Sequence, residues 1–242
     1  MPAIVRTLEA SVCTLCISNI EKHNAFSQDM ANSLLQYLQD ADQDDTVRSV
    51  VIHGDGESAF SSGDDISELM QGAEFSMDPF TYPLTMSKPV IAAINGYCVG
   101  SGFCLAISCD LRVGAENAKF CSPAASLGML PEGGQIARLS TLVGRTFASE
   151  MMYLGEQISA AEAHHFGLLN RIVPKEQVLE HANRMARKIA SNSTGSVQAI
   201  KMGLQIAERD GVHSANAYEA EHAASFRKSA EALSSMRTFS SR

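Results

Sequence analysis

Short apolar runs of strand length alternate with amphipathic stretches of helix length as far as Pro174, and this alternation limits the folds that the chain can adopt. Beyond Pro174 only helical patterns follow. Strands that alternate with helices are typical of an α/β fold. We therefore expect an α/β protein with a helical C-terminal layer. The expected strands are 12–17, 47–53, 89–94 and 111–115, and the expected helices begin after Ser27 and cover 102–108, 134–142, 176–190 and 197–208.

The last helices carry apolar side chains whose partners the sequence does not identify. Ile200, Leu204 and Leu233 are examples. They face either the protein's own core or an interface between subunits, and the pattern fits both interpretations equally.

Charge and hydropathy exclude several classes of protein. The 242 residues carry a formal net charge of -8, whereas a general nucleic-acid binder usually presents a basic face. The longest apolar run, 89–94, is too short to span a bilayer, and no secretory signal is visible. We expect a cytoplasmic protein that binds neither nucleic acid nor membrane.

The six cysteines are typical of reduced core residues, because most of them lie inside apolar runs. Cys13 and Cys16 form a C-x-x-C pattern, but no second Cys or His pair follows at zinc spacing. The glycines at 54 and 56 follow a strand without opening a helix, so they indicate a turn and no dinucleotide site. We expect neither a metal nor a bound cofactor.

Two glycine-rich turns, 61–66 and 96–102, each follow a strand and precede a helix. Small residues in such turns let a ligand oxygen approach the backbone N–H groups closely. Two N–H donors that converge on one carbonyl form an oxyanion hole. The simpler interpretation, that both turns are helix entries, is favoured by the turns alone.

A single carboxylate, Glu132, follows about thirty residues after the second turn, in the sequence Pro-Glu-Gly-Gly at 131–134. We expect it at the start of a helix. One base beside an oxyanion hole suits the transfer of a proton next to a carbonyl. The alternative is a glutamate that only complements the helix dipole.

Several segments together resemble the crotonase (enoyl-CoA hydratase/isomerase) superfamily over nearly the whole chain. They are residues 17–26, 59–69, 88–106, 109–113, 127–131, 155–163 and 167–174. The resemblance implies a spiral of β-β-α units over 1–190, a helical trimerisation region over 191–242, and a homotrimer or hexamer. It also implies an acyl-CoA thioester as substrate, with CoA present only as part of that substrate.

The resemblance assigns the oxyanion hole to the N–H groups of Asp64 and Ser101. Ser101 replaces the usual glycine, which is tolerable because the donor is the backbone. The family's Arg-Pro before the first helix is Asn-Ile at 19–20, which weakens the case for a phosphate contact there. The implied CoA- and substrate-binding positions are Lys22, Ser62, Gly63, Asp65, Ile66, Gly100, Phe103, Ala124 and Leu127.

Two departures from the family pattern decide the expected reaction. Cys104 and Ala124 stand where hydratases of the family carry two glutamates, and addition of water needs acid and base groups on that water. Glu132 matches the single catalytic glutamate of some Δ3,Δ2-enoyl-CoA isomerases. The resemblance therefore implies an isomerase in which Glu132 moves a proton from C2 to C4.

Two alternatives remain open at this point. One is another crotonase reaction at the same thioester, such as hydration, decarboxylation or nucleophilic displacement. The other is a CoA-binding pseudoenzyme. The irregular segment 72–87 either walls the acyl site or is a surface loop.

Overall fold

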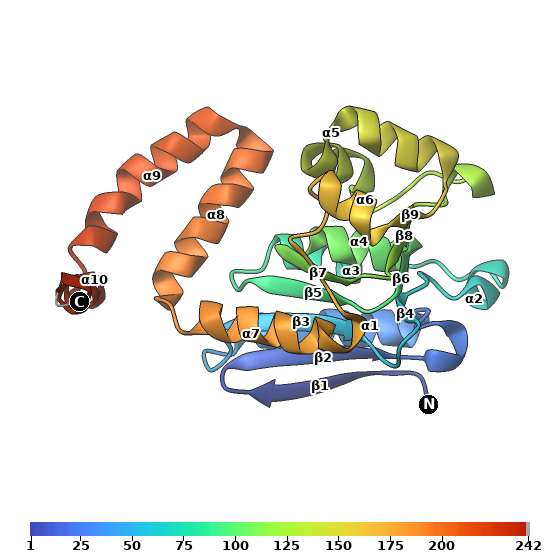
Figure 1. The fold of residues 1–242 in the computed structure, drawn as a ribbon, viewed down its shortest axis with the longest axis horizontal. Coiled ribbons are helices and arrows are strands. Elements are labelled where there is room, and N and C mark those ends of the chain that lie inside the picture. The colour runs from blue at the N-terminus through green and yellow to red at the C-terminus, as the bar shows by residue number, and fades with distance from the viewer. Residues whose placement is uncertain (241–242) are drawn as a thin grey trace.

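The structure is a computed structural model that describes residues 1–240. Figure 1 shows the order of its elements along the chain. The strands are β1 Ala3–Glu9, β2 Val12–Ser18, β3 Ser49–Gly54, β4 Ala59–Ser61, β5 Val90–Ile94, β6 Tyr97–Val99, β7 Leu111–Ala115, β8 Lys119–Cys121, β9 Ile158–Ser159 and β10 Arg171–Val173. The α-helices are α1 Gln28–Gln43, α2 Ile66–Met70, α3 Asp78–Thr81, α4 Gly100–Ser108, α5 Gln135–Leu154, α6 Ala160–His165, α7 Val178–Ala190, α8 Thr194–Asp210, α9 Val212–Arg227 and α10 Ala230–Ser240.

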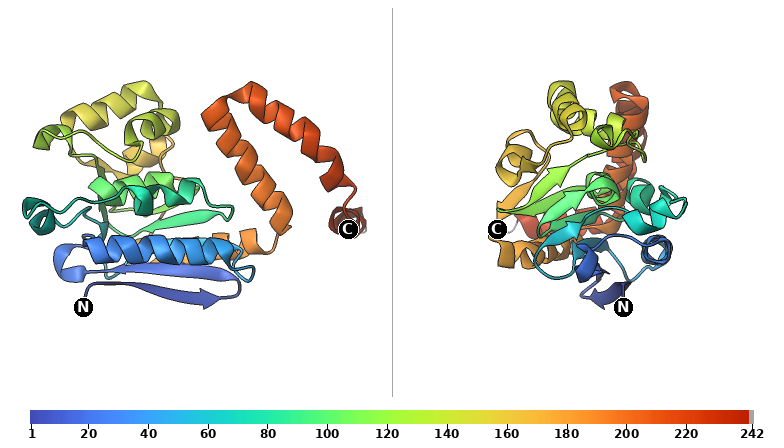
Figure 2. Two further views of the ribbon diagram at one scale, coloured as in Figure 1. Left: turned by 180° about the vertical axis from the view of Figure 1, so that it is seen from behind. Right: turned by 90° about the vertical axis from the view of Figure 1, so that its right-hand side faces the viewer.

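A six-stranded sheet in the order β1-β2-β3-β5-β7-β10 forms the base of the molecule. Only the β1–β2 pair is antiparallel, and the other neighbours run parallel. Parallel sheets are normally covered on both faces. Helices α1 and α7 lie on opposite faces of this sheet, as the front and rear views show (Figures 1 and 2).

A second sheet, in the order β4-β6-β8-β9, lies beside the first. Its first three strands run parallel to one another. Each belongs to a unit whose preceding strand (β3, β5 or β7) lies in the six-stranded sheet, and each unit continues into a helix. This repetition of strand, strand and helix confirms the α/β class and the spiral of β-β-α units.

Local sequence signals account for the main helices. Ser27 caps α1 by accepting a hydrogen bond from the N–H of Met30, at 3.2 Å. The face of α1 that carries Met30, Leu34 and Leu38 is buried. Strand 111–115 has the expected bounds, and α4 begins two residues before its expected start.

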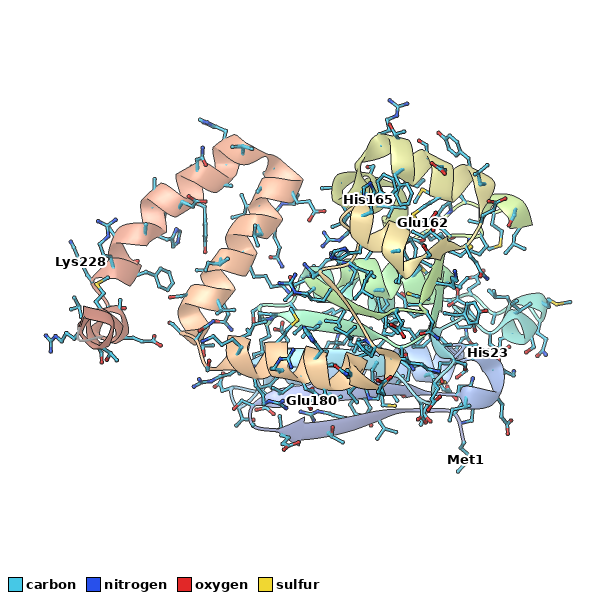
Figure 3. The ribbon with its side chains drawn as sticks, viewed as in Figure 1. Met1, His23, Glu162, His165, Glu180 and Lys228 are labelled. Atoms are coloured by element: carbon cyan, nitrogen blue, oxygen red, sulfur yellow. The ribbon has the colours of Figure 1, made fainter. Side chains whose placement is uncertain are left out.

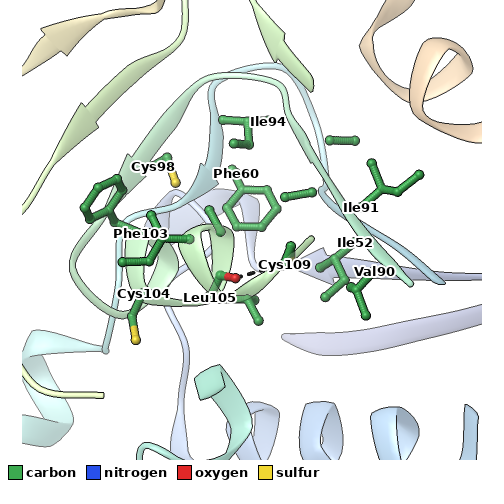
Figure 4. Close-up of a cluster of buried hydrophobic side chains, with 14 of the residues drawn as sticks. Ile52, Phe60, Val90, Ile91, Ile94, Cys98, Phe103, Cys104, Leu105 and Cys109 are labelled. Atoms are coloured by element: carbon green, nitrogen blue, oxygen red, sulfur yellow. Dashed lines mark hydrogen bonds between the residues drawn. The ribbon is translucent and has the colours of Figure 1, made fainter. Parts of the chain in front are cut away.

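The hydrophobic core is built from both sheets and from helices that include α1, α4, α5 and α7. Figure 4 shows part of it, where Phe60, Phe103 and Leu105 pack together with no exposed surface. All six cysteines are free thiols, five of them buried and Cys16 half-buried. Burial of a cysteine as a small apolar side chain is common, and the structure confirms that role for five of the six.

The C-terminal helices α8, α9 and α10 extend away from the two sheets (Figures 1 and 2). In Figure 3, Lys228 at the end of α9 and His23 lie at opposite ends of the molecule. Lys201 joins α8 to the core through its buried ammonium group, which donates to Asp110 Oδ2 at 2.8 Å and to the carbonyls of Lys88 and Pro83. Residues 241 and 242 lie outside the described part of the chain.

The division at residue 190 agrees with the end of α7 but stays a prediction. No helix among residues 1–240 is long and apolar enough to cross a membrane.

Candidate active site

The segments that follow β4, β6 and β8 meet at one edge of the four-stranded sheet. These strands are neighbours and run parallel, so their carboxyl ends lie together. The first segment carries Gly63 and Asp64, the second Gly100 and Ser101, and the third Glu132. Ligands of open α/β sheets usually bind beyond the carboxyl ends of strands. The fold thus brings together the three positions that were expected to be catalytic.

The backbone of Asp64 presents its N–H away from the neighbouring chain. The two residues beside it bond Phe26: the Phe26 N–H donates to the Gly63 carbonyl, and the Asp65 N–H donates to the Phe26 carbonyl, both at 2.8 Å. In such a parallel bridge the middle residue, Asp64, directs its own N–H and C=O to the opposite side. Its N–H is therefore directed away from Phe26.

The second N–H, that of Ser101, lies in the first turn of α4, where helix geometry leaves it without an intrahelical acceptor. The two turns are in close contact. A Cβ at Gly63, whose φ is +97°, would lie only 3.2 Å from the Ser101 nitrogen. At Gly102 a Cβ would lie 2.6 Å from Ser61 Cβ. Only glycine lets the two backbones approach this closely.

The side chains of the same two residues also interact, which the sequence did not predict. The Ser101 hydroxyl donates a hydrogen bond to Asp64 Oδ2. The other carboxyl oxygen, Oδ1, is buried and has no hydrogen-bond partner among residues 1–240. Burial raises the pKa of the Asp64 carboxyl, the bond from Ser101 opposes this, and the charge of Glu132 raises the pKa further. The site therefore holds a second carboxyl group.

The segment that carries Glu132 is fastened over α4. The Cys104 thiol contacts the carbonyls of Glu132 and Gly133 at 3.9 and 3.7 Å. A Cβ at Gly133 would lie 2.6 Å from Cys104 Sγ and 3.2 Å from Thr81 Cγ2. Cys104 follows Ser101 by three residues on the same helix, so these contacts place Glu132 near the glycine-rich turn 96–102 that carries Ser101. Burial raises the pKa of Cys104 to about 12, which keeps it a neutral thiol.

Glu132 does not lie at the first turn of a helix, contrary to expectation. Gly133 and Gly134 both have positive φ, at +66° and +74°, and α5 begins only at Gln135. Residues with left-handed backbone cannot be part of a right-handed α-helix, so α5 begins only after Gly134. Glu132 is exposed, and the helix dipole acts on it less than it would on a first-turn residue.

Lys22 is paired within the protein. Its ammonium group forms an ion pair with Asp65 and donates to Ser67 Oγ at 3.1 Å. Asp65 also caps α2 by accepting from the Ser67 N–H. The bonds from Lys22 and then Ser67 lower the pKa of Asp65 to about 2. Lys22 keeps about half of its side chain exposed, so a phosphate contact would share the ammonium with Asp65.

The other expected substrate-binding positions differ in exposure. Gly63 is buried, Ser62, Gly100 and Ala124 are half-buried, and Ile66 and Leu127 are exposed at 68% and 63%. Phe103 has no exposed surface and points into the core (Figure 4), so it has no surface with which to touch a ligand. Its side chain instead packs α4 against the hydrophobic core.

The segment 72–87 is more ordered than a surface loop. It contains α3 and a short 3-10 turn, and Phe80 is fully buried against Phe26, with ring centroids 5.0 Å apart. Thr81 and Met77 lie next to Gly133, so this segment packs against the loop that carries Glu132.

Comparison with known proteins identifies related sequences. A family model described as enoyl-CoA hydratase/isomerase matches residues 7–242. The chain is 31% identical over 226 residues to a short-chain-enoyl-CoA hydratase from Clostridium acetobutylicum, covering 90% of this chain and 87% of that protein. It is also 31% identical over 220 residues to a 1,2-epoxyphenylacetyl-CoA isomerase from Escherichia coli, covering 86% of this chain and 84% of that protein.

Solved structures show the same architecture. A crystal structure of an enoyl-CoA hydratase from Bacillus anthracis superposes with a TM-score of 0.93 at 27% identity, and covers 98% of this chain and 96% of that one. The similarity includes the C-terminal helices, since almost the whole of both chains is matched.

Proposed function

The chain belongs to the enoyl-CoA hydratase/isomerase family and is an acyl-CoA enzyme of the crotonase type, and we propose that it converts 3-enoyl-CoA into 2-enoyl-CoA. One observation carries the proposal. Glu132 is held by the Cys104 contacts near the two turn amides, while the two positions where hydratases of the family carry glutamates hold a thiol and a methyl group.

The proposed reaction needs one base. The thioester oxygen accepts from the N–H groups of Asp64 and Ser101. Glu132 removes a proton from C2, and the electron pair of the C–H bond moves onto the thioester as a dienolate. The same carboxyl returns the proton to C4, which moves the double bond into conjugation. Each N–H donor of this kind typically lowers the activation barrier by roughly 3–4 kcal/mol.

Hydration is the second candidate. Two observations favour it: several relatives are named hydratases, and Asp64 supplies a second carboxyl close enough for its pKa to respond to Glu132. Addition of water uses one group to activate the water and another to handle the proton. We rank it second because the Asp64 carboxyl is bonded to Ser101 beside the amides, on the side of the carbonyl.

Paired incubations separate the two reactions. The purified protein is mixed with 3-hexenoyl-CoA or with 2-hexenoyl-CoA, and the absorbance of the conjugated thioester is followed. Isomerisation predicts a rise with the first substrate. Loss of absorbance with the second and no change with the first would assign hydration and overturn the proposed reaction. No change with either would leave an enzyme for an unusual acyl group or a protein that only binds CoA.

The C-terminal helices support assembly of several copies. Ile200, Met202 and Leu204 on α8 are 45–66% exposed, and α8 to α10 extend from the sheets (Figure 1). Apolar side chains in such numbers on extended helices suit contact with another subunit. A homotrimer or hexamer, expected from the family resemblance, predicts a matching mass in light scattering, and a monomer at micromolar concentration would contradict it.

A further inference from the structure

The carboxyl of Asp64 is the unusual group of this site, because one of its oxygens is satisfied and the other is not. Oδ2 accepts from the Ser101 hydroxyl, whereas Oδ1 is buried without a partner among residues 1–240. Buried polar atoms almost always have a hydrogen-bond partner, so an orphan at a candidate ligand site points to a group that the ligand supplies. Asp64 is also the residue whose N–H is directed away from Phe26.

The charge of this carboxyl matters for any enolate formed nearby. An ionised Asp64 would place a negative charge beside the oxygen on which the reaction develops another, and like charges in a poorly solvated site repel strongly. A protonated Asp64 removes that repulsion and adds an O–H donor. Burial of the carboxyl and the nearby Glu132 favour the protonated form, the bond from Ser101 opposes it, and Cys104 is a neutral thiol.

Lys22, the cation that pairs with the neighbouring Asp65, does not offset this. Lys22 is directed to Asp65, the neighbouring residue, where it forms an ion pair. The carboxyl of Asp65 in turn accepts from Lys22 and Ser67. Among the described residues, Ser101 is therefore the hydrogen-bond donor to the Asp64 carboxyl.

We propose that the protonated carboxyl of Asp64, oriented by the Ser101 hydroxyl, donates a third hydrogen bond to the thioester oxygen beside the two backbone N–H groups. The inference rests on the proposed function in one respect only, that a thioester binds at this turn. Ser101 donates to Oδ2, so the proton lies on Oδ1, the oxygen that lacks a partner. The proton stays on Asp64 throughout, and the bond strengthens as negative charge grows on the thioester oxygen. A neutral carboxylic acid serves an enolate in this way in ketosteroid isomerase.

The pH dependence follows with a definite sign. Asp64 is a donor only while it is protonated, so turnover falls as the pH rises through its pKa, which burial raises. The Ser101 bond stabilises the carboxylate and lowers that pKa. Ser101→Ala should therefore move the alkaline limb of the pH–rate profile to higher pH, because it removes a bond that favours ionisation. A purely structural role of Ser101 would leave the limb in place.

Two substitutions at Asp64 form a matched pair. Asp64→Asn keeps a neutral donor of nearly the same shape, and we expect turnover within about tenfold of wild type without the alkaline limb. Asp64→Ala removes the donor, and loss of one oxyanion donor typically lowers kcat about 10²- to 10³-fold. Both variants keep the backbone N–H. Equal activity of wild type and Asp64→Ala across the pH range would overturn the proposal.

A spectroscopic measurement tests the bond without any turnover. Hexanoyl-CoA labelled with ¹³C at the thioester carbonyl is bound to the wild type and both variants, and the infrared carbonyl band is recorded. We expect a lower frequency in wild type and Asp64→Asn than in Asp64→Ala, because an added donor weakens the C=O bond. An identical band in all three proteins would overturn the inference.

The two proposals fail in different ways. A shifted carbonyl band in a protein that does not isomerise 3-hexenoyl-CoA would reject the reaction and keep the role of Asp64. An unshifted band in an active isomerase would reject the role of Asp64 alone. Loss of 2-hexenoyl-CoA hydration in Asp64→Ala with an unshifted band would assign Asp64 to water, and that also overturns the inference.

Discussion

The oxyanion turns and the Glu132 loop meet at one site but are built differently. The turns are buried and in backbone contact: Gly63 lies against the Ser101 nitrogen, and Gly102 against Ser61. The loop before α5 is exposed, with Leu127 and Leu130 at 63% and 72%, and it is held mainly through Gly133. The proposed hydrogen-bond donors are thus fixed in the core, while the proposed base lies on a surface segment.

The two regions need different degrees of precision. Hydrogen-bond donors act on an oxygen whose position must be set to a few tenths of an ångström, and donors that are already in place need no reorganisation during the reaction. A base that serves two carbon atoms of the substrate benefits from some freedom. Changes in the loop should therefore alter the chemistry with little effect on stability, whereas changes in the turns should alter both.

Substitution of Glu132 should have the strongest effect on catalysis and should leave the stability of the fold unchanged. Glu132→Gln removes the base and should lower kcat for 3-hexenoyl-CoA about 10²- to 10⁴-fold, which is the usual contribution of a general base. Because Glu132 is exposed, the free energy of unfolding should change little. Glu219→Gln, at an exposed position of α9, is the control. A Glu132→Gln enzyme with at least half of the wild-type rate would contradict the account.

The next change strikes the turns. Gly102→Ala would place a Cβ 2.6 Å from Ser61 Cβ and 2.8 Å from its carbonyl oxygen, so the two turns must separate. We expect a loss of about 1–3 kcal/mol in the free energy of unfolding, measured in urea, together with lower activity. Gly195→Ala lies in α8, where the added Cβ would be 3.5 Å from Phe226 Cε1, and it should not destabilise the protein. Full activity of Gly102→Ala would show that the turns tolerate displacement.

A smaller effect concerns the ion pair that flanks the turns. Asp65→Asn keeps an oxygen that can cap α2 but removes the charge that pairs with Lys22, and should cost about 0.5–1 kcal/mol at pH 7. The pKa of Asp65 is lowered from 3.8 to about 2, so its contribution is present above pH 3.8 and is lost as the pH falls through about 2. The free energies of unfolding of wild type and Asp65→Asn, measured at several pH values, should converge at low pH. Asp45→Asn, in an exposed loop, is the control.

The smallest effect concerns the exposed apolar side chains of the loop. Leu130→Ala should raise the KM for 3-hexenoyl-CoA by less than about tenfold, since each methylene that a substrate covers is worth about 0.8 kcal/mol. Leu233→Ala, on α10, should leave KM unchanged. A large fall in kcat for Leu130→Ala, with KM unchanged, would mean that the loop positions Glu132 more tightly than its exposure suggests.

Much of this architecture was predictable from the sequence, because period and turn chemistry are local signals. Ser27 and the buried face of α1 follow from helical spacing, and the glycines at 63 and 100 indicated that backbone N–H groups would be presented. The neighbouring positions of β4 and β6 then brought the two turns together. The assignment of the oxyanion hole to Asp64 and Ser101 followed from the family resemblance, and the fold explains why their backbones lie close together.

The pairings across these turns were not predictable. Asp64 and Ser101 are separated by 37 positions, and only the fold shows that their side chains meet. Lys22 and Asp65 pair for the same reason. The sequence did contain one signal: in each turn a polar residue directly follows a glycine, Asp64 after Gly63 and Ser101 after Gly100. The late start of α5 depends on the positive φ angles at Gly133 and Gly134. Two successive glycines in a sequence do not indicate whether the backbone there is helical or left-handed.

Tracing the migrating hydrogen tests the central claim, that one carboxylate serves both carbon atoms. 3-Hexenoyl-CoA carrying deuterium at C2 is converted in a single turnover in ordinary water, and the 2-enoyl product is examined by mass spectrometry and NMR. Transfer by a single carboxylate predicts that part of the deuterium lost from C2 reaches C4. A C4 hydrogen that comes wholly from the solvent, together with a Glu132→Gln variant that still forms the 2-enoyl product, would mean that a second group delivers it, and would contradict the assignment of both transfers to Glu132.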